Sequence, residues 1–162
     1  MARWKELPMM NVVEGAREDA GRCLSIAGSL PQYFSPKGLE TMGRDLAENP
    51  FYVARDEAGQ VLGFASVKRR TEQAAELAWM AVAADHRRQG VGTAILETVC
   101  DELRAKGLRL LLVKTLSGRV HYEPYEATRR FYQRAGFIHI DTIDPYPEWG
   151  PDSPCDVYAR ML

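Results

Sequence analysis

The hydrophobic pattern of the first half of the chain predicts two helices followed by a β-hairpin. Apolar side chains recur with helical spacing over Glu14 to Ala27 and over Lys37 to Glu48, and Asn49-Pro50 ends the second helix. Short apolar runs follow at Phe51 to Ala54 and at Val61 to Val67. The turn-forming residues between the two runs indicate an antiparallel hairpin.

The second half of the chain alternates strands with helices. Glu76 to Val82 predicts a third strand, and Gly90 to Lys106, apolar at every fourth position, predicts the longest helix. The later elements are a nearly all-apolar buried strand, a short helix that ends at Gly136, and two closing strands: Leu108 to Val113, Glu126 to Ala135, Phe137 to Ile143 and Asp156 to Leu162. This order predicts an α/β fold with one mixed sheet, and excludes a doubly wound parallel sheet.

Composition narrows the class of protein. The 162 residues, of which 46% are hydrophobic and 27% charged, are typical of one folded domain spanning 1–162. A net charge of -1 disfavours a nucleic-acid partner. No apolar run is long enough to span a membrane, and the polar N-terminus does not resemble a signal peptide, so we expect a cytoplasmic protein with no membrane partner. The dispersed Cys23, Cys100 and Cys155 predict neither a disulfide scaffold nor a metal site.

One segment has the composition of an anion site. Arg87-Arg88-Gln89-Gly90-Val91-Gly92-Thr93 lies between the third predicted strand and the long helix. Glycines let a ligand approach the backbone, and the free N–H groups and dipole of a helix start favour a phosphate. The dinucleotide motif would need glycine at Ile95, and no P-loop tripeptide occurs. The alternative is a tight turn with solvated arginines.

The segment resembles the acetyl-CoA-binding motif Arg-x-x-Gly-x-Gly of the GNAT superfamily of N-acetyltransferases, with Arg87, Gly90 and Gly92 at the motif positions. The strand before it, the buried strand after it, and the late segment from Ala127 to Phe137 are also similar to that family. The resemblance covers about Phe51 to Ile140. Many relatives have asparagine where Ala127 and Thr128 stand here, so any cofactor contact by that asparagine is not carried over.

The resemblance implies a GNAT-like acyl-CoA N-acyltransferase fold, with a central, mostly antiparallel mixed sheet and flanking helices. It also implies acetyl-CoA as co-substrate, with no metal. Seven backbone positions would cradle the pyrophosphate: Arg87, Arg88, Gln89, Gly90, Val91, Gly92 and Thr93. Met80, Ala81 and Val82 would offer backbone groups to the pantetheine arm, and the next strand would splay away near its end.

Acetyl transfer to an amine needs a base and an acid, because the amine is mostly protonated at neutral pH and the thiolate leaves more easily with a proton. Tyr132 matches the family's tyrosine acid, and we expect it to face a cleft while Phe131 faces the core. The alternative is a structural tyrosine.

Glu76 is the expected base, directly or through a water, at a position where several relatives keep theirs. The alternative is a charged residue at a frayed strand start. Glu123, Glu126 and His121 are rival bases.

The aromatic segments Tyr33-Phe34 and Tyr146 to Trp149 could wall an acceptor pocket, cover the sheet or form a homodimer interface. We favour the pocket, which would suit a compact acceptor. The sequence therefore predicts an acetyl-CoA-dependent N-acetyltransferase acting on a primary amine of a small molecule by direct transfer. Two alternatives stay open: acetylation of a protein N-terminus or lysine, which an acidic groove would favour, and a catalytically silent acyl-CoA-binding module.

Overall fold

The computed structural model describes residues 9–162, so the polar N-terminus discussed above lies outside the described residues. The described strands form a mixed seven-stranded sheet in the order β1-β2-β3-β4-β5-β7-β6. The recorded strand pairs are antiparallel except β4 with β5, which is parallel. This confirms the predicted mixed sheet. The described chain packs as two compact units, residues 9–67 with 79–99 and residues 68–78 with 100–162. That the chain is one domain stays a prediction.

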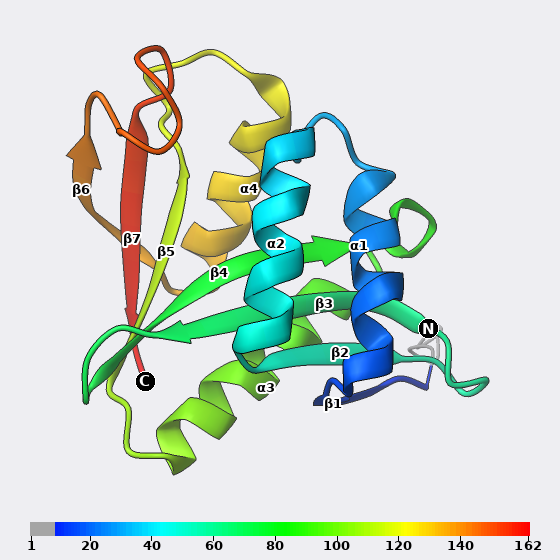
Figure 1. Ribbon diagram of the computed structural model, residues 1–162. Helices are drawn as coiled ribbons and strands as arrows, with labels where there is room; N and C mark the ends of the chain where they lie inside the picture. The colour runs from blue at the N-terminus through cyan, green and yellow to red at the C-terminus, as the bar shows by residue number, and fades with distance from the viewer. Residues whose placement is uncertain (1–8) are drawn as a thin grey trace, which may run out of the picture. The chain divides into compact units, whose positions relative to one another are not determined.

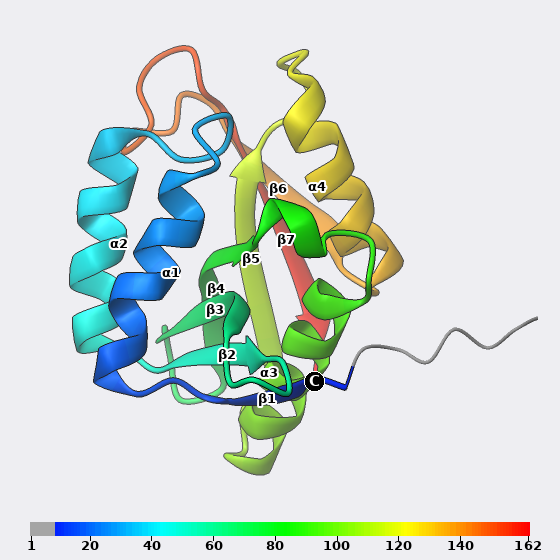
Figure 2. The same ribbon diagram turned by 90° about the vertical axis from the view of Figure 1, so that its right-hand side faces the viewer.

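The first unit contains two helices, α1 (Ala20–Gly28) and α2 (Pro36–Glu48), which lie side by side in Figures 1 and 2. It also contains β1 (Asn11–Glu14), β2 (Phe51–Arg55) and most of β3 (Val61–Arg69). Helix α2 begins as its sequence suggests, because Ser35 accepts a hydrogen bond from the Gly38 amide at 3.0 Å and Pro36 occupies the first turn. Apolar residues of both helices pack with residues of β2 and β3 in one core: Cys23, Ile26, Met42, Leu46, Phe51, Val53 and Phe64.

The predicted helix from Glu14 to Ala27 is wrong at its start. Residues Asn11–Glu14 form strand β1, antiparallel to β2, and a short 3₁₀ turn η1 (Arg17–Asp19) separates it from α1. Gly15 makes this path possible, since a Cβ there would collide with the ring of Phe51. A four-residue strand has too few positions to show a period, and its pairing with β2 determines its conformation.

The second unit is built on three strands and one helix, β5 (Leu110–Leu116), β6 (Ile138–Ile143), β7 (Cys155–Met161) and α4 (Glu123–Arg134). Strand β7 pairs antiparallel with both β5 and β6, and α4 lies against β5 (Figure 2). Strand β4 (Ala74–Val82) and helix α3 (Val91–Ala105) each continue from one unit into the other. Strand β5 runs three residues beyond its predicted end at Val113.

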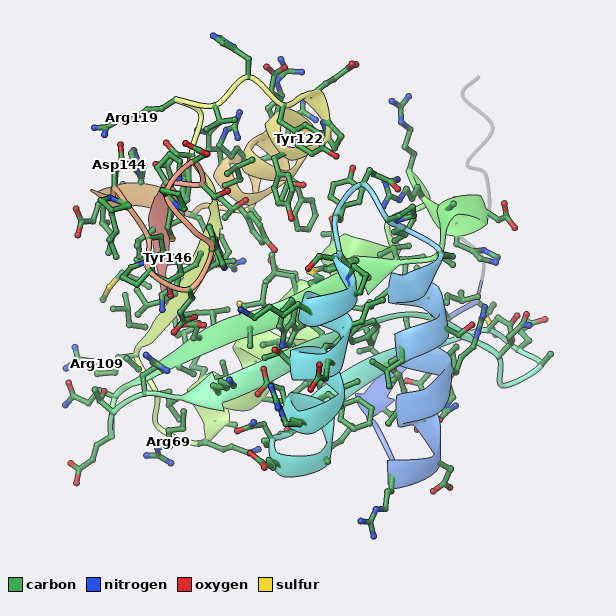
Figure 3. The ribbon with its side chains drawn as sticks, turned by 45° about the horizontal axis from the view of Figure 1, so that its top comes forward. Arg69, Arg109, Arg119, Tyr122, Asp144 and Tyr146 are labelled. Atoms are coloured by element: carbon green, nitrogen blue, oxygen red, sulfur yellow. The ribbon has the colours of Figure 1, made fainter. Side chains whose placement is uncertain are left out.

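The aromatic and proline-rich loop between β6 and β7 is anchored on the sheet. Tyr146 is buried and clusters with Cys155 and Val157 of β7, with Leu112 and Ile143 packed alongside. Trp149 packs edge-on against Tyr146, with ring centroids 4.8 Å apart. Figure 3 labels Tyr146 in this loop, together with the ion pair of Arg119 and Asp144 at 3.4 Å. The loop therefore covers a face of the sheet in the second unit, one of the three roles considered for it.

A buried carboxylate, Asp156 of β7, fixes the segment that precedes α4. It accepts hydrogen bonds from the Thr142 hydroxyl at 2.7 Å and the Gly118 amide at 3.3 Å, and His139 Nε2 lies 3.3 Å away. Burial alone would raise its pKa, but these bonds, with one from the Ser117 hydroxyl, outweigh burial and hold the pKa below its ordinary value. Asp156 is thus a structural anchor that is ionised at neutral pH.

Cys23, Cys100 and Cys155 are buried free thiols. Within residues 9–162, no group of three or more His, Cys, Asp or Glu side chains is arranged to hold a metal ion. The same part of the chain contains no helix with the length and apolar character needed to cross a bilayer.

Candidate active site

The predicted anion-binding turn lies in the first unit, between the end of β4 and the start of α3. A 3₁₀ turn, η2 (Ala84–His86), leads into it, and both Arg88 (φ 59°) and Gly90 (φ 79°) have left-handed backbones. The first helical bond runs from the Ala94 amide to the Gly90 carbonyl at 3.0 Å, so the amides of residues 91–93 have no acceptor within the helix. A Cβ added at Gly90 would meet no heavy atom within 4 Å. The turn therefore has the free donors and the open surface that a pyrophosphate needs.

The side chain of Arg87 is held beside this turn by the loop between α1 and α2. Its guanidinium stacks on the Tyr33 ring, 5.0 Å from the centroid, and its Nη1 lies 3.3 Å from the Tyr33 hydroxyl. On the other side, Gln89 Nε2 donates to the Asp85 carbonyl at 3.2 Å and closes the turn. The sequence did not reveal this aromatic partner of Arg87, because Tyr33 is 54 residues away.

The end of β4, predicted to carry the pantetheine contacts, is fixed against β3. The Ala83 amide donates to the Leu62 carbonyl at 2.9 Å. A Cβ on Gly63 would lie 2.9 Å from the Ala81 carbonyl oxygen and 3.2 Å from Val82 Cα, so only glycine permits this close approach. The parallel pairing of β4 with β5 runs from Ala74 and Leu110 to Leu77 and Val113, and the splaying of the next strand stays a prediction.

Trp79 of β4 makes contacts that the sequence did not reveal. Its indole Nε1 donates to Asp45 Oδ2 of α2 at 2.6 Å, and its ring packs against Phe34, 6.3 Å between centroids. Asp45 is itself buried. A buried carboxylate on α2 thus holds the indole of β4 in place, and Phe34 of the α1–α2 loop packs on that indole.

Glu76 lies in the second unit at the centre of a small ionic cluster. The parallel register sets Glu76 beside Leu112, and Lys114, two residues further along β5, projects from the same face. Lys114 Nζ is 3.1 Å from Glu76 Oε1, and Arg70 Nε is 3.9 Å from the same oxygen. That oxygen is buried and its contact with Lys114 is an ion pair without hydrogen-bond geometry. The exposed 13% of the Glu76 side chain therefore belongs to its other atoms.

Lys114 connects Glu76 to the aromatic loop. Its ammonium donates to the Tyr146 hydroxyl at 3.2 Å and lies 5.6 Å from the centre of that ring, and the Tyr146 hydroxyl in turn donates to Glu148 at 3.3 Å. Burial alone would lower the pKa of Lys114, but the contacts with Glu76 and Tyr146 outweigh burial and raise that pKa. Lys114 is therefore a charged, largely buried ammonium, which sequence reasoning missed.

Tyr132 lies in α4, also in the second unit, and is more buried than expected. Only 6% of it is exposed, and its ring packs edge-on against Phe131 and Phe137, with centroids 5.3 and 5.4 Å away. Phe131 is half-buried, so the expected order of exposure for this pair is wrong. Burial, with a smaller contribution from Tyr125, raises the pKa of Tyr132. Its hydroxyl is thus protonated at neutral pH, as an acid must be, and its catalytic role stays a prediction.

The rival bases precede α4 or lie in its first turns. His121 and Glu123 are exposed, and Glu126 is half-buried. Glu76 differs from them because its carboxylate is largely buried and two cations fix it in place.

Comparisons with known proteins identify the class. Residues 47–139 match the acetyltransferase (GNAT) domain family. A candidate acetyltransferase of the GNAT family from Desulfovibrio desulfuricans has a similar structure, with a TM-score of 0.83 and 24% identity over 94% of this chain and 99% of that one. No curated protein sequence matches the chain significantly.

Two further solved structures share the fold. One is a GNAT family acetyltransferase from Elizabethkingia anophelis with acetyl-CoA bound (TM-score 0.73, 18% identity, 94% of this chain and 98% of that one). The other is the ribosomal-protein-S18-alanine N-acetyltransferase from Escherichia coli (TM-score 0.71, 21% identity, 95% and 94%).

The chain belongs to the GNAT acetyltransferase family, because the family match covers more than half of its length. The family assignment and the mixed α/β fold predicted from the sequence are both confirmed. Members of this family are in general N-acetyltransferases that use acetyl-CoA.

Proposed function

We propose that this protein is an acetyl-CoA-dependent N-acetyltransferase that moves an acetyl group directly to the primary amine of a small molecule. The observation that carries the proposal is the open, donor-rich turn of residues 87–93 at the end of the strand that also bears Glu76. Glu76 precedes Met80 by four residues in the sequence of β4.

The residues of the turn fit a coenzyme A pyrophosphate. The amides of residues 91–93 would donate to its oxygens, with Arg88 supplying positive charge beside them. Backbone groups of residues 80–82 would bind the pantetheine arm, on a strand that Gly63 holds close to β3. Acetyl-CoA would supply an activated acetyl thioester. The proposal includes no metal.

Glu76 and Tyr132 would move the two protons of the reaction. The Glu76 carboxylate takes a proton from the acceptor ammonium, directly or through a water, and frees the amine lone pair. The new N–C bond forms, and the acetylated nitrogen loses its second proton to solvent. The C–S bond breaks as Tyr132 gives its hydroxyl proton to the departing sulfur. Solvent then restores the proton on Tyr132 and accepts the one held by Glu76. General acid and base catalysis each contribute about 10²- to 10⁴-fold.

The charges around Glu76 support a small acceptor. Arg70 and Lys114 both face its carboxylate, so the base does not lie in an acidic groove of the kind that would attract a lysine-rich peptide. The Escherichia coli neighbour is named for acetylating a ribosomal protein, so protein acetylation is the alternative that the experiment must test.

Free-thiol release from acetyl-CoA across a panel of amines tests the proposal. The panel includes amino acids, polyamines, antibiotics and peptides, each with and without enzyme. We expect release that depends on a compact amine and that falls about 10²- to 10⁴-fold in Glu76→Gln. Glu72→Gln, at an exposed position four residues earlier, is the matched control and should retain full activity. Release with peptides alone would favour the protein-acetylating alternative.

A further inference from the structure

The ammonium of Lys114 has more hydrogen-bonding capacity than its surroundings use. It carries three N–H donors; within residues 9–162 it donates to the Tyr146 hydroxyl at 3.2 Å and forms an ion pair, without hydrogen-bond geometry, with Glu76 Oε1 at 3.1 Å. The side chain is only 23% exposed, so solvent replaces the missing partner poorly. A charged donor in this setting favours an anionic ligand over a neutral one.

A second cation lies on the same carboxylate. The Arg70 side chain is 48% exposed, and its Nε lies 3.9 Å from Glu76 Oε1, so this guanidinium can offer further N–H donors to a ligand. The third charged neighbour, Glu148, is bound to the far side of the Tyr146 hydroxyl, at 3.3 Å. Two cations thus adjoin Glu76 directly, whereas Glu148 is separated from Lys114 by a phenol.

This arrangement is complementary to one kind of amine. In an amino acid, the ammonium and the carboxylate are separated by only one or two carbons, and Glu76 and Lys114 are likewise in contact, each with part of its side chain exposed. An amino carboxylate can therefore direct its nitrogen at Glu76 while its carboxylate meets Lys114. A simple amine would satisfy Glu76 but leave the free donor of Lys114 without an acceptor, and a site with unpaired donors discriminates strongly against such a ligand.

We propose that Lys114, held by Tyr146 and assisted by Arg70, is a carboxylate-binding subsite, and that the acceptor is an amino carboxylate. This inference rests on the proposed transferase function and names its substrate class. Lys114 binds the anionic group of the acceptor, and Tyr146 is a positioning residue that keeps the ammonium beside Glu76. The aromatic loop of residues 144–154 thereby contributes to selectivity through a single phenol.

Matched pairs of acceptors test the subsite. Initial rates of thiol release are measured for amino acids and for their carboxamides, which retain the amine and lose the negative charge. The amine of a carboxamide is less basic than that of the amino acid, so more of it is unprotonated at neutral pH. This difference favours the carboxamide and so opposes the expected preference. We expect the carboxylates to have a kcat/KM about 10- to 100-fold higher, mainly through KM, as is usual for a charge-assisted hydrogen bond.

The variants separate a binding role from a merely structural one. Lys114→Met also removes a cation beside the Glu76 base and should lower the rates with both kinds of acceptor. The readout is therefore the ratio of kcat/KM within each pair, which should fall to about one in Lys114→Met and only partly in Lys114→Arg. Lys106→Met, at an exposed position of the same unit, is the control and should behave as wild type. If Lys114→Met does not fold, Tyr146→Phe replaces it and should reduce the preference several-fold.

The possible failures can be told apart. Equal rates for both members of every pair, or a preference that survives Lys114→Met or Tyr146→Phe, would overturn the subsite and leave the transferase function standing. If neither the amino acids nor their carboxamides support thiol release, the transferase function itself is contradicted, and the subsite with it.

Discussion

Replacing Tyr132 by phenylalanine should abolish most turnover while leaving the fold and acetyl-CoA affinity almost unchanged. The substitution keeps the ring, which packs edge-on at 5.3 Å from Phe131 and 5.4 Å from Phe137. Losing a buried aromatic ring costs about 3–5 kcal/mol of stability, whereas losing one hydroxyl costs about 1 kcal/mol. Because the hydroxyl would supply the proton to the leaving sulfur, turnover should fall about 10²- to 10⁴-fold.

The pH dependence gives a second readout of the same change. Burial raises the pKa of Tyr132, so its hydroxyl stays protonated throughout the usual assay range and does not set the basic limb of the pH–rate profile. Tyr132→Phe should therefore lower the whole profile without changing its shape. With acyl donors that have better leaving thiols, Tyr132→Phe should lower the rate less, because their thiolates depart without a proton donor.

Single-turnover kinetics would measure the chemical step, thermal unfolding the stability, and calorimetry the acetyl-CoA affinity. The control is Tyr122→Phe, at a more exposed tyrosine beside the N-terminus of the same helix. Full single-turnover rates in Tyr132→Phe would remove the general-acid role. A variant that unfolds would instead show that the hydroxyl is needed by the core.

Four further predictions concern the base, the turn, the close strand contact and the acid stability. Glu76→Gln should lose most activity at neutral pH and partly recover as rising pH deprotonates the acceptor, and an unchanged pH–rate profile would transfer the role to another group. Gly92 has a helical backbone, so Gly92→Ala should bind acetyl-CoA in calorimetry whereas Gly92→Glu, which adds a negative charge at the pyrophosphate, should not. Gly63→Ala should cost about 1–3 kcal/mol in chemical unfolding, since its Cβ would lie 2.9 Å from a carbonyl oxygen, and unchanged stability would contradict that crowding. The pKa of Asp156 is lowered in the fold, so its contribution to stability is present above the ordinary pKa of 3.8 and is lost as pH falls through the folded pKa. In urea unfolding, the stability of Asp156→Asn should therefore fall less steeply with decreasing pH than that of the wild type.

The sequence predicted best the parts of the protein that local patterns control. Helix α3 has an apolar residue at every fourth position from Val91, and the predicted anion-binding turn carries glycines and arginines within seven residues, so both could be recognised without a fold. Strand β1 could not be recognised from the sequence, because four residues show no period and only the pairing with β2 determines their conformation. The face of Tyr132 was also missed, since neighbouring positions on a helix are distinguished only by what packs on them.

The surroundings of the base were the least predictable part. The apolar run of β5 ends at Val113, so Lys114 resembled the first residue of a loop. The surroundings of Lys114 depend on the parallel register of β5 with β4, which places it on the same face as Glu76. They also depend on Tyr146, 32 residues further along the chain. The bond from Trp79 to Asp45 likewise joins residues 34 positions apart. Such contacts follow from tertiary packing, and no local pattern encodes them.

Mass spectrometry of a reaction with acetyl-CoA and an amino carboxylate tests the central claim most directly. The account predicts that wild-type protein converts the amine into its mono-acetyl derivative, with one free coenzyme A formed per acetylated product. Glu76→Gln should form both products together and far more slowly. Free coenzyme A without acetylated amine would indicate a hydrolase, and no conversion of acetyl-CoA with any amine would contradict the assignment of this chain as an active N-acetyltransferase.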